Sequence, residues 1–135
     1  MFFRQEHRVD TKKEEFKEVN RLVRETVKES GVENGFCLVF CPHTTAGITV
    51  NERESGLKKD FLNYFKKIAP REQGYEHDKG PETNAHAHIR SVLTGNNTVI
   101  PVENSELVLG TWQNIFLVEG DGPRKRSIKV YVYGE

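Results

Sequence analysis

Apolar residues recur at helical spacing in two segments, each of which predicts an amphipathic helix. The first helix is expected to begin at Asp10-Thr11, where Thr11 and Glu14 stand in capping-box register, and to end at Gly31. The second is expected over residues 54–69, before a proline. The two apolar stripes are Phe16, Val19, Val23, Thr26 and Val27, and Leu57, Phe61, Phe65 and Ile68.

Short β-rich runs separated by turn residues account for most of the remaining chain. Residues 35–41 are a continuous apolar run, which predicts a central buried strand, whereas residues 3–9 alternate loosely and are expected at an edge. A long exposed loop is expected over residues 71–82, and a third helix capped by Thr83 follows it to about Leu93. Further strands are expected at residues 47–52, 98–102, 107–109, 114–118 and 127–132.

Composition narrows the class of protein to a single α+β domain over residues 1–135. Hydrophobic residues make up 36% and charged residues 30%, which fits a surface rich in ion pairs or an oligomer that buries apolar area between subunits. Twenty basic and twenty acidic residues balance, which argues against nucleic acid as a partner. No apolar stretch approaches the roughly 20 residues of a membrane span, and the start lacks signal-peptide character. We therefore expect a cytoplasmic protein without a membrane partner.

The two cysteines, Cys37 and Cys41, are too few for a disulfide framework. Four residues apart on one strand, their Cα atoms would be separated by about 13 Å, whereas a disulfide needs less than about 7 Å. We therefore expect two free thiols that pack as small buried hydrophobic side chains.

Four of the five histidines lie in polar segments in the middle of the chain. His43 directly follows the apolar run, and His77 lies in the long loop. On the third helix, His88 shares a face with Asn84, whereas His86 points roughly the other way. Neutral imidazoles converging from separate segments suit a borderline metal such as zinc, with an open position for substrate. Surface or capping histidines without a ligand are the alternative.

Two acidic residues and the single tryptophan are further candidates. Glu52, at the end of the strand that follows His43, would act as a general base, orient an imidazole or lie in solvent. Asp60 falls on the second helix, either as a functional carboxylate or as part of its charged face. Trp112 follows a glycine turn and is either a core anchor or a platform on which an aromatic ring stacks.

Residues 120–126 combine glycines with three consecutive cations, Arg124, Lys125 and Arg126. Backbone amides of such a turn, together with an arginine, would hold an anionic group such as phosphate. The alternative is an ordinary hairpin loop with solvated charges. The glycines do not make a dinucleotide-binding motif, because no helix follows them.

Five ordered segments carry a resemblance to a known family. They are residues 41–52 (CPHTTAGITVNE), 74–78 (GYEHD), 84–89 (NAHAHI), 109–113 (LGTWQ) and 121–124 (DGPR). Together they make the chain similar to the YjbQ-like family, also called secondary thiamine-phosphate synthase. The resemblance covers nearly the whole chain and implies an α+β, mixed or antiparallel β-sandwich-like fold, assembled as a homotrimer with clefts close to the subunit interfaces. Residues 54–56 are Glu-Ser-Gly, where the family often has an Asp-Pro pair.

By motif position, three groups of site residues follow. A divalent metal, zinc or magnesium, would be held by His43, His77 and His88. A phosphorylated small-molecule substrate would be bound by Asn84, Thr44, Arg124 and Gln113. The residues that would take part in catalysis are Glu52, Asp60 and Trp112. His86 occupies a position where the family varies.

The reaction that the resemblance implies, a weak activity in the family, joins a pyrimidine-methyl pyrophosphate to a thiazole phosphate and releases pyrophosphate. Cations on the leaving oxygens and an aromatic wall near the ring would favour it. Pyrophosphate sites prefer Mg²⁺ with oxygen ligands, whereas histidines favour zinc, so a zinc-dependent hydrolase of a small phosphorylated metabolite is a second hypothesis. A non-catalytic trimeric metabolite-binding protein is a third, which predicts tight binding without turnover.

Overall fold

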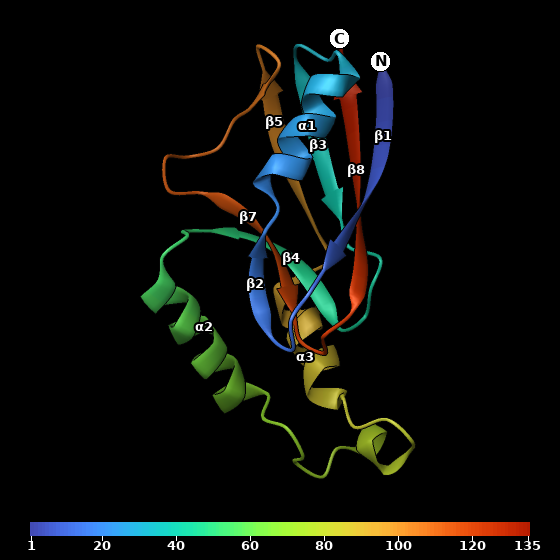
Figure 1. The fold of residues 1–135 in the computed structure, drawn as a ribbon, viewed down its shortest axis with the longest axis vertical. Helices are drawn as coiled ribbons and strands as arrows, with labels where there is room; N and C mark the ends of the chain where they lie inside the picture. Colours follow the sequence, from blue (N-terminus) through green and yellow to red (C-terminus); the bar gives the residue numbers. More distant parts are fainter.

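Two antiparallel sheets form the centre of the protein (Figure 1). The computed structural model describes all 135 residues. The strands are β1 (Phe2–Asp10), β2 (Glu15–Glu18), β3 (Gly35–Phe40), β4 (Ala46–Asn51), β5 (Asn97–Glu103), β6 (Glu106–Leu107), β7 (Asn114–Glu119) and β8 (Lys125–Gly134). The helices are α1 (Asn20–Ser30), α2 (Ser55–Ile68) and α3 (Ala85–Thr94), with a short 3-10 helix, η1 (Glu76–Lys79). The larger sheet has the order β1-β8-β3-β5-β6 and the smaller one β2-β7-β4, which confirms the α+β class with three helices.

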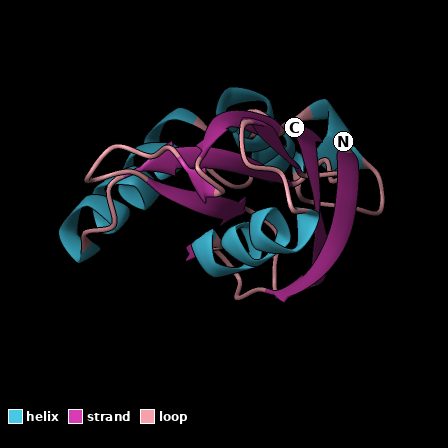
Figure 2. Cartoon of the chain, turned by 90° about the horizontal axis from the view of Figure 1, so that it is seen from above, coloured by secondary structure: helices cyan, strands magenta, loops and turns pink.

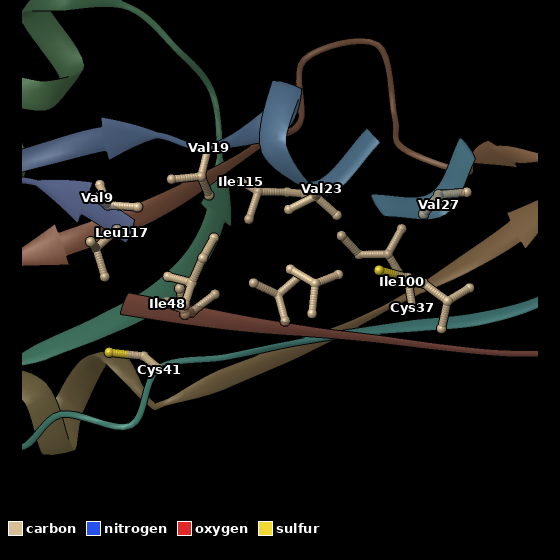
Figure 3. Close-up of a cluster of buried hydrophobic side chains, with 14 of the residues drawn as sticks. Val9, Val19, Val23, Val27, Cys37, Cys41, Ile48, Ile100, Ile115 and Leu117 are labelled. Carbon is tan, nitrogen blue, oxygen red and sulfur yellow. The ribbon is translucent and has the colours of Figure 1, made fainter. Parts of the chain in front are cut away.

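The core lies between the two sheets and α1 (Figure 3). Val23 and Val27 of α1 are buried together with Cys37 and Ile100 of the larger sheet and Ile115 of the smaller one. Along β3 and β5 the buried positions alternate with more exposed ones, and along α1 they recur at the helical period, whereas β7 is buried at consecutive positions. Removing this apolar surface from water is the main favourable contribution to folding.

The first helix is shorter than its apolar stripe predicts, because Glu15–Glu18 form strand β2 instead. The predicted end at Gly31 is confirmed, with a left-handed φ of 71°. The hydroxyl of Thr11 caps no helix and donates to Glu119 at 2.6 Å. Phe16 packs on α2 from the strand. The inward-facing Phe16 of β2 therefore continues the apolar stripe of α1 only by coincidence, and this made the predicted helix too long.

The central strand β3 lies between β8 and β5, as predicted, but only one of its faces is covered. Cys37 points into the core, whereas Phe36 on the other face is 60% exposed. Phe2, Tyr133 and Val99 are also exposed, and Phe2, Tyr133 and Phe36 are paired across β1, β8 and β3. We call these four residues, Phe2, Phe36, Val99 and Tyr133, the outer sheet face.

The helices lie around the strands (Figure 2), and aromatic contacts hold α2 in place. Phe61 and Phe65 stack on Phe16 with ring centroids 5.1 and 6.1 Å apart, although no residue of α2 is buried. The third helix begins one residue later than Thr83 would predict: Asn84 is its N-cap. None of the helices has both the length and the apolar character that a membrane span needs.

Both cysteines are free and buried, as predicted. Cys37 and Cys41 belong to the core of the larger sheet and the segment that follows β3. Burial raises the pKa of Cys37 to about 12 and also raises the pKa of Cys41. Neither thiol forms the reactive thiolate near neutral pH.

Candidate functional site

Four polar residues from three segments form a continuous hydrogen-bonded chain. The segments are η1, the start of α3 and the turn between β7 and β8, which lie in the lower part of Figure 1. The guanidinium of Arg124 and the amide nitrogen of Asn84 both donate to Oδ2 of Asp121, each at 2.8 Å. The amide oxygen of Asn84 lies 2.8 Å from Nε2 of His77. We call these residues, His77, Asn84, Asp121 and Arg124, the polar chain.

Local structure explains why these segments meet. The turn between β7 and β8 supplies Asp121 and Arg124, and Nε of Arg124 also donates to the backbone oxygen of Asp121 at 2.8 Å. The carboxylate of Asp78 accepts from the N–H of Ala85 at 3.1 Å, which ties η1 to the start of α3. Tyr75 donates to the backbone oxygen of Pro70 at 2.7 Å, which anchors the other end of the loop.

A second imidazole lies against the polar chain. The rings of His77 and His88 have centroids 4.9 Å apart and meet edge to face. A surface hollow of about 310 Å³ is lined by Tyr75, His77, Ala85, His88 and Ile89. The hollow therefore combines two imidazoles with an apolar wall, which is a common composition for a small-molecule site.

The helical spacing correctly separates the two histidines of α3. Asn84 and His88 both contact His77, whereas His86 is fully buried and neither of its ring nitrogens has a hydrogen-bond partner. Burial, together with the charges of Arg71 and Arg90, lowers the pKa of His86. His86 therefore lies neutral in the interior, away from the hollow.

A buried ion pair supports the turn that carries the polar chain. Nε of Arg126 donates to Oε1 of Glu119 at 2.7 Å, and a terminal guanidinium nitrogen donates to Oε2 at 2.5 Å. Glu119 also accepts from the N–H of Asp121 at 2.9 Å, and Arg126 donates to the hydroxyl of Thr45 at 2.8 Å. Arg126 is thus buried against Glu119 and Thr45, and of the three consecutive cations only Arg124 and Lys125 are exposed and able to meet an anion.

The site favours an ionised Asp121. Burial alone would raise the pKa of this carboxyl, but the hydrogen bonds from Asn84 and Arg124 and the charge of Arg124 outweigh burial and lower it. Arg124 keeps 48% of its side chain exposed, so part of its guanidinium faces solvent beside the polar chain. The arrangement offers a fixed cation to an anionic ligand.

His43 makes a different set of contacts. Its Nε2 lies 3.0 Å from the backbone N–H and 3.1 Å from the backbone oxygen of Ser127. Burial, then the charge of Arg126, lowers its pKa, and Arg124 acts in the same direction. Within the chain, no group of three or more His, Cys, Asp or Glu residues is placed to hold a metal ion. The structure therefore joins His77 to His88 but does not place His43 with them.

The remaining predicted residues are spread over other parts of the surface. Asp60 lines a separate groove of about 510 Å³ between α2, β4 and α3, with aromatic walls. Trp112 is 70% exposed, so the interpretation as a core anchor is wrong. Gln113 accepts from the N–H of Gly110 at 2.8 Å and shapes its own turn. Thr44 is exposed and Glu52 half-buried, and neither lines the hollow beside His77.

Two residues of the site were missed as candidates in the sequence analysis. Asp121 joins Asn84 to Arg124, and Tyr75 forms part of the hollow. Both fall inside the segments that carry the family resemblance, GYEHD and DGPR, which was the available signal. Hydrogen bonding between segments 37 residues apart, however, has no local sequence pattern.

Comparison with known proteins identifies the family. A sequence model described as "UPF0047 protein YjbQ-like" matches residues 5–135. This chain belongs to the UPF0047, or YjbQ-like, family. The UPF0047 protein YugU of Bacillus subtilis (strain 168) is 42% identical over 125 residues, which cover 92% of this chain and 93% of the relative. A UPF0047 protein of Archaeoglobus fulgidus is 46% identical over 97 residues, covering 72% of this chain and 76% of the relative.

Solved structures share the YjbQ-like fold over the full chain. A YbjQ-like protein from Sulfolobus solfataricus P2, described as of unknown function, superposes with a TM-score of 0.96 at 40% identity and covers 100% of this chain and 99% of its own. A hypothetical protein from Aeropyrum pernix K1 gives a TM-score of 0.93 at 35% identity, with 98% of each chain covered. The resemblance found in the sequence is confirmed at the level of family and fold.

Proposed function

We propose that this YjbQ-like protein is a small-molecule transferase of the thiamine-phosphate synthase type, whose substrates carry phosphate and pyrophosphate groups. The supporting observation is the polar chain beside the hollow lined by Tyr75, His77 and His88. A guanidinium that is linked through Asp121 and Asn84 to His77, in the wall of a hollow with aromatic and aliphatic sides, suits a ligand that combines a heterocycle with an anionic group. The family resemblance supplies the reaction class.

In the proposed reaction the C–O bond of the pyrimidine-methyl pyrophosphate breaks, and pyrophosphate leaves with the electron pair. The methylene carbon then forms a C–N bond with the thiazole nitrogen. Negative charge develops on the leaving oxygens, so donors fixed before the reaction lower the barrier most. Asp121 holds Arg124 in one orientation through two hydrogen bonds of 2.8 Å, and Arg124 takes the donor role toward pyrophosphate. His77 and His88, when protonated, add donors from the same side.

One chain brings together only part of the predicted set of ligands for a divalent metal. His77 and His88 lie together, but a typical zinc site needs at least three protein ligands, and Nε2 of His43 faces the backbone of Ser127. The residues of a single chain do not complete such a site, so the proposed mechanism uses the protein's own groups alone. Metal binding by His43, His77 and His88 stays a prediction for the assembled protein.

Catalytic roles for Glu52, Asp60 and Trp112, and substrate binding by Thr44 and Gln113, also stay predictions. None of these residues lines the hollow of the same chain. An assembly in which a neighbouring subunit approaches the hollow is the arrangement under which they would contribute.

We further propose that the protein assembles as a homotrimer. The apolar run of β3 predicted burial on both faces, yet the outer sheet face, with Phe36 and Tyr133, is open in one chain. A second apolar surface lies on α2 and α3, with exposed Tyr64, Val92 and Leu93. Two different apolar surfaces on one chain are what a ring of three subunits requires, because each interface pairs one surface with the other.

The catalytic proposal is tested by assaying product formation from the two phosphorylated substrates. Replacing Arg124 by methionine should lower kcat/KM by about 10²-fold, the usual effect of removing one fixed donor to a developing charge. Lys125→Met is the matched control, because Lys125 is exposed, neighbours Arg124 and takes no part in the polar chain. Full activity of Arg124→Met would contradict the proposal. Tight binding of both substrates without turnover by the wild type would instead support a metabolite-binding protein, and release of inorganic phosphate a hydrolase.

Metal content and assembly have their own tests. Elemental analysis of unchelated protein should find about one divalent metal per chain, lost in His88→Ala, if the histidine prediction holds.

Light scattering should give the mass of a trimer, and Phe36→Lys should give a smaller species because it places a charge on the outer sheet face. Glu106→Lys, on the exposed β5–β6 hairpin, is the control. A wild type that is monomeric would overturn the trimer.

A further inference from the structure

Donors and acceptors along the polar chain leave only one consistent arrangement. An ionised carboxylate accepts hydrogen bonds and donates none, so the group of Asn84 that faces Asp121 is its NH₂. The oxygen of Asn84 then faces Nε2 of His77, at 2.8 Å. An amide oxygen also only accepts, so Nε2 of His77 must carry the proton. The orientation of the amide and the tautomer of the imidazole both follow from the charge of Asp121.

We propose that Asp121 is a positioning residue that fixes His77 as the Nε2–H tautomer through the amide of Asn84. Three hydrogen bonds fix the position of Asp121. Arg124 donates to its carboxylate and to its backbone oxygen, each at 2.8 Å, and the buried carboxylate of Glu119 accepts from its N–H at 2.9 Å. Glu119 is itself paired with Arg126, so the polar chain is anchored in the core.

The consequence concerns the other ring nitrogen. Nε2 of His77 donates to Asn84 whether the imidazole is neutral or protonated, so a ligand in the hollow meets His77 only at Nδ1. Neutral His77 accepts a hydrogen bond or a proton there, and protonated His77 donates there. The use of Nδ1 toward a substrate rests on the proposed function, whereas the tautomer does not.

The test is nitrogen NMR of the metal-free protein with ¹⁵N-labelled histidine, in slightly alkaline solution, above the ordinary pKa of an imidazole. Wild-type protein should show a protonated, pyrrole-type Nε2 and an unprotonated, pyridine-type Nδ1, with the Nε2–H form in more than about tenfold excess, as a charge-assisted chain of hydrogen bonds favours. Asp121→Asn should lower that ratio several-fold, because a neutral amide oxygen accepts more weakly than the carboxylate and the amide can also turn its NH₂ toward Asn84. The Nε2 proton should also exchange faster with water.

Two further variants separate positioning from a general disturbance of the loop. Glu76→Gln removes the same charge from an exposed residue adjacent to His77 and should leave the tautomer ratio unchanged. The double swap Asn84→Asp with Asp121→Asn again presents an acceptor to Nε2, and should restore the ratio that Asp121→Asn loses. These readouts are independent of how well each variant turns over substrate.

Three results would overturn the inference: an Nδ1–H tautomer in the wild type, an unchanged ratio in Asp121→Asn, or no restoration in the double swap. The outcome is also distinct from that of the proposed function. A fixed Nε2–H tautomer without any transferase activity refutes the proposed function alone, and activity with an unconstrained tautomer refutes the positioning by Asp121 alone.

Discussion

Replacing Arg126 by methionine removes the cationic partner of a carboxylate that lies almost entirely inside the protein. Glu119 and Arg126 are 1% and 6% exposed, and two hydrogen bonds, at 2.7 and 2.5 Å, join them. In the variant, Glu119 would keep only the hydroxyl of Thr11 and the N–H of Asp121 as donors. Breaking one side of a buried pair costs about 3–5 kcal/mol, so we expect Arg126→Met to lose that much unfolding free energy at neutral pH.

The pH dependence of this loss follows from the pKa of Glu119. Burial tends to raise it, but the hydrogen bonds from Arg126 and Thr11 dominate and lower it below its ordinary value. The carboxylate therefore stabilises the fold above its unfolded-state pKa, and this contribution is lost as the pH falls through the lower, folded-state pKa. Without Arg126, burial prevails and the carboxyl protonates more readily. The difference between wild type and variant should therefore shrink on acidification.

Urea denaturation followed by circular dichroism measures both effects, at about pH 7 and about pH 4 and at one protein concentration. Arg21→Met is the control, since the ion pair of Arg21 with Glu25 is exposed and its loss should cost less than about 1 kcal/mol. Adding Glu119→Gln to Arg126→Met should recover part of the stability, because no buried charge then remains unpaired. A loss below about 1 kcal/mol at neutral pH, or an equal loss at both pH values, would refute the reasoning.

Three further predictions concern packing and reactivity. Leu117→Ala, in the fully buried core, should cost about 2–5 kcal/mol of unfolding free energy, whereas Arg24→Ala, on the exposed face of α1, should change it by less than about 0.5 kcal/mol; equal effects in urea denaturation would contradict the assigned core. Gly35→Ala should yield little folded protein, because a Cβ there would overlap a backbone oxygen of β8; a wild-type circular dichroism melt would disprove this. Cys37 and Cys41 should both resist thiol reagents at neutral pH until the protein is denatured, and rapid labelling of native protein would show that their burial is not maintained.

Much of the fold follows from local sequence patterns. The apolar run at β3, the four-residue spacing along α2 and the glycine that ends α1 each predict an element that the structure contains. The pattern failed at Phe16, where a strand and a helix lie end to end and their inward residues happen to continue one helical stripe. The pairing of the strands, including the place of β2 in a second sheet, could not be predicted in this way. It depends on contacts between residues that are far apart in the sequence.

Part of the candidate site also followed from local sequence patterns, and part did not. The helical period placed Asn84 and His88 on one side of α3 and His86 on the other, and both placements are correct. The link from Asn84 through Asp121 to Arg124 depends on how the β7–β8 turn approaches the start of α3. The burial of Arg126 could not be predicted from the local charge. Three consecutive cations indicate an exposed basic turn, but the alternation of side chains along β8 directs Arg126 into the interior.

The position of β8 has a consequence for how the protein is made. This strand is the last in the chain, yet it lies between β1 and β3, and its partners in β1 lie 115 to 131 positions earlier. During synthesis the first strand must wait without its partner until residues 125–134 leave the ribosome, and its apolar side chains remain exposed until then. The larger sheet therefore closes in a late step that joins the two ends of the domain, which is a slow kind of contact to form. A nascent chain that stalls before β8 would present unpaired strand edges to its neighbours and would be a natural client for chaperones.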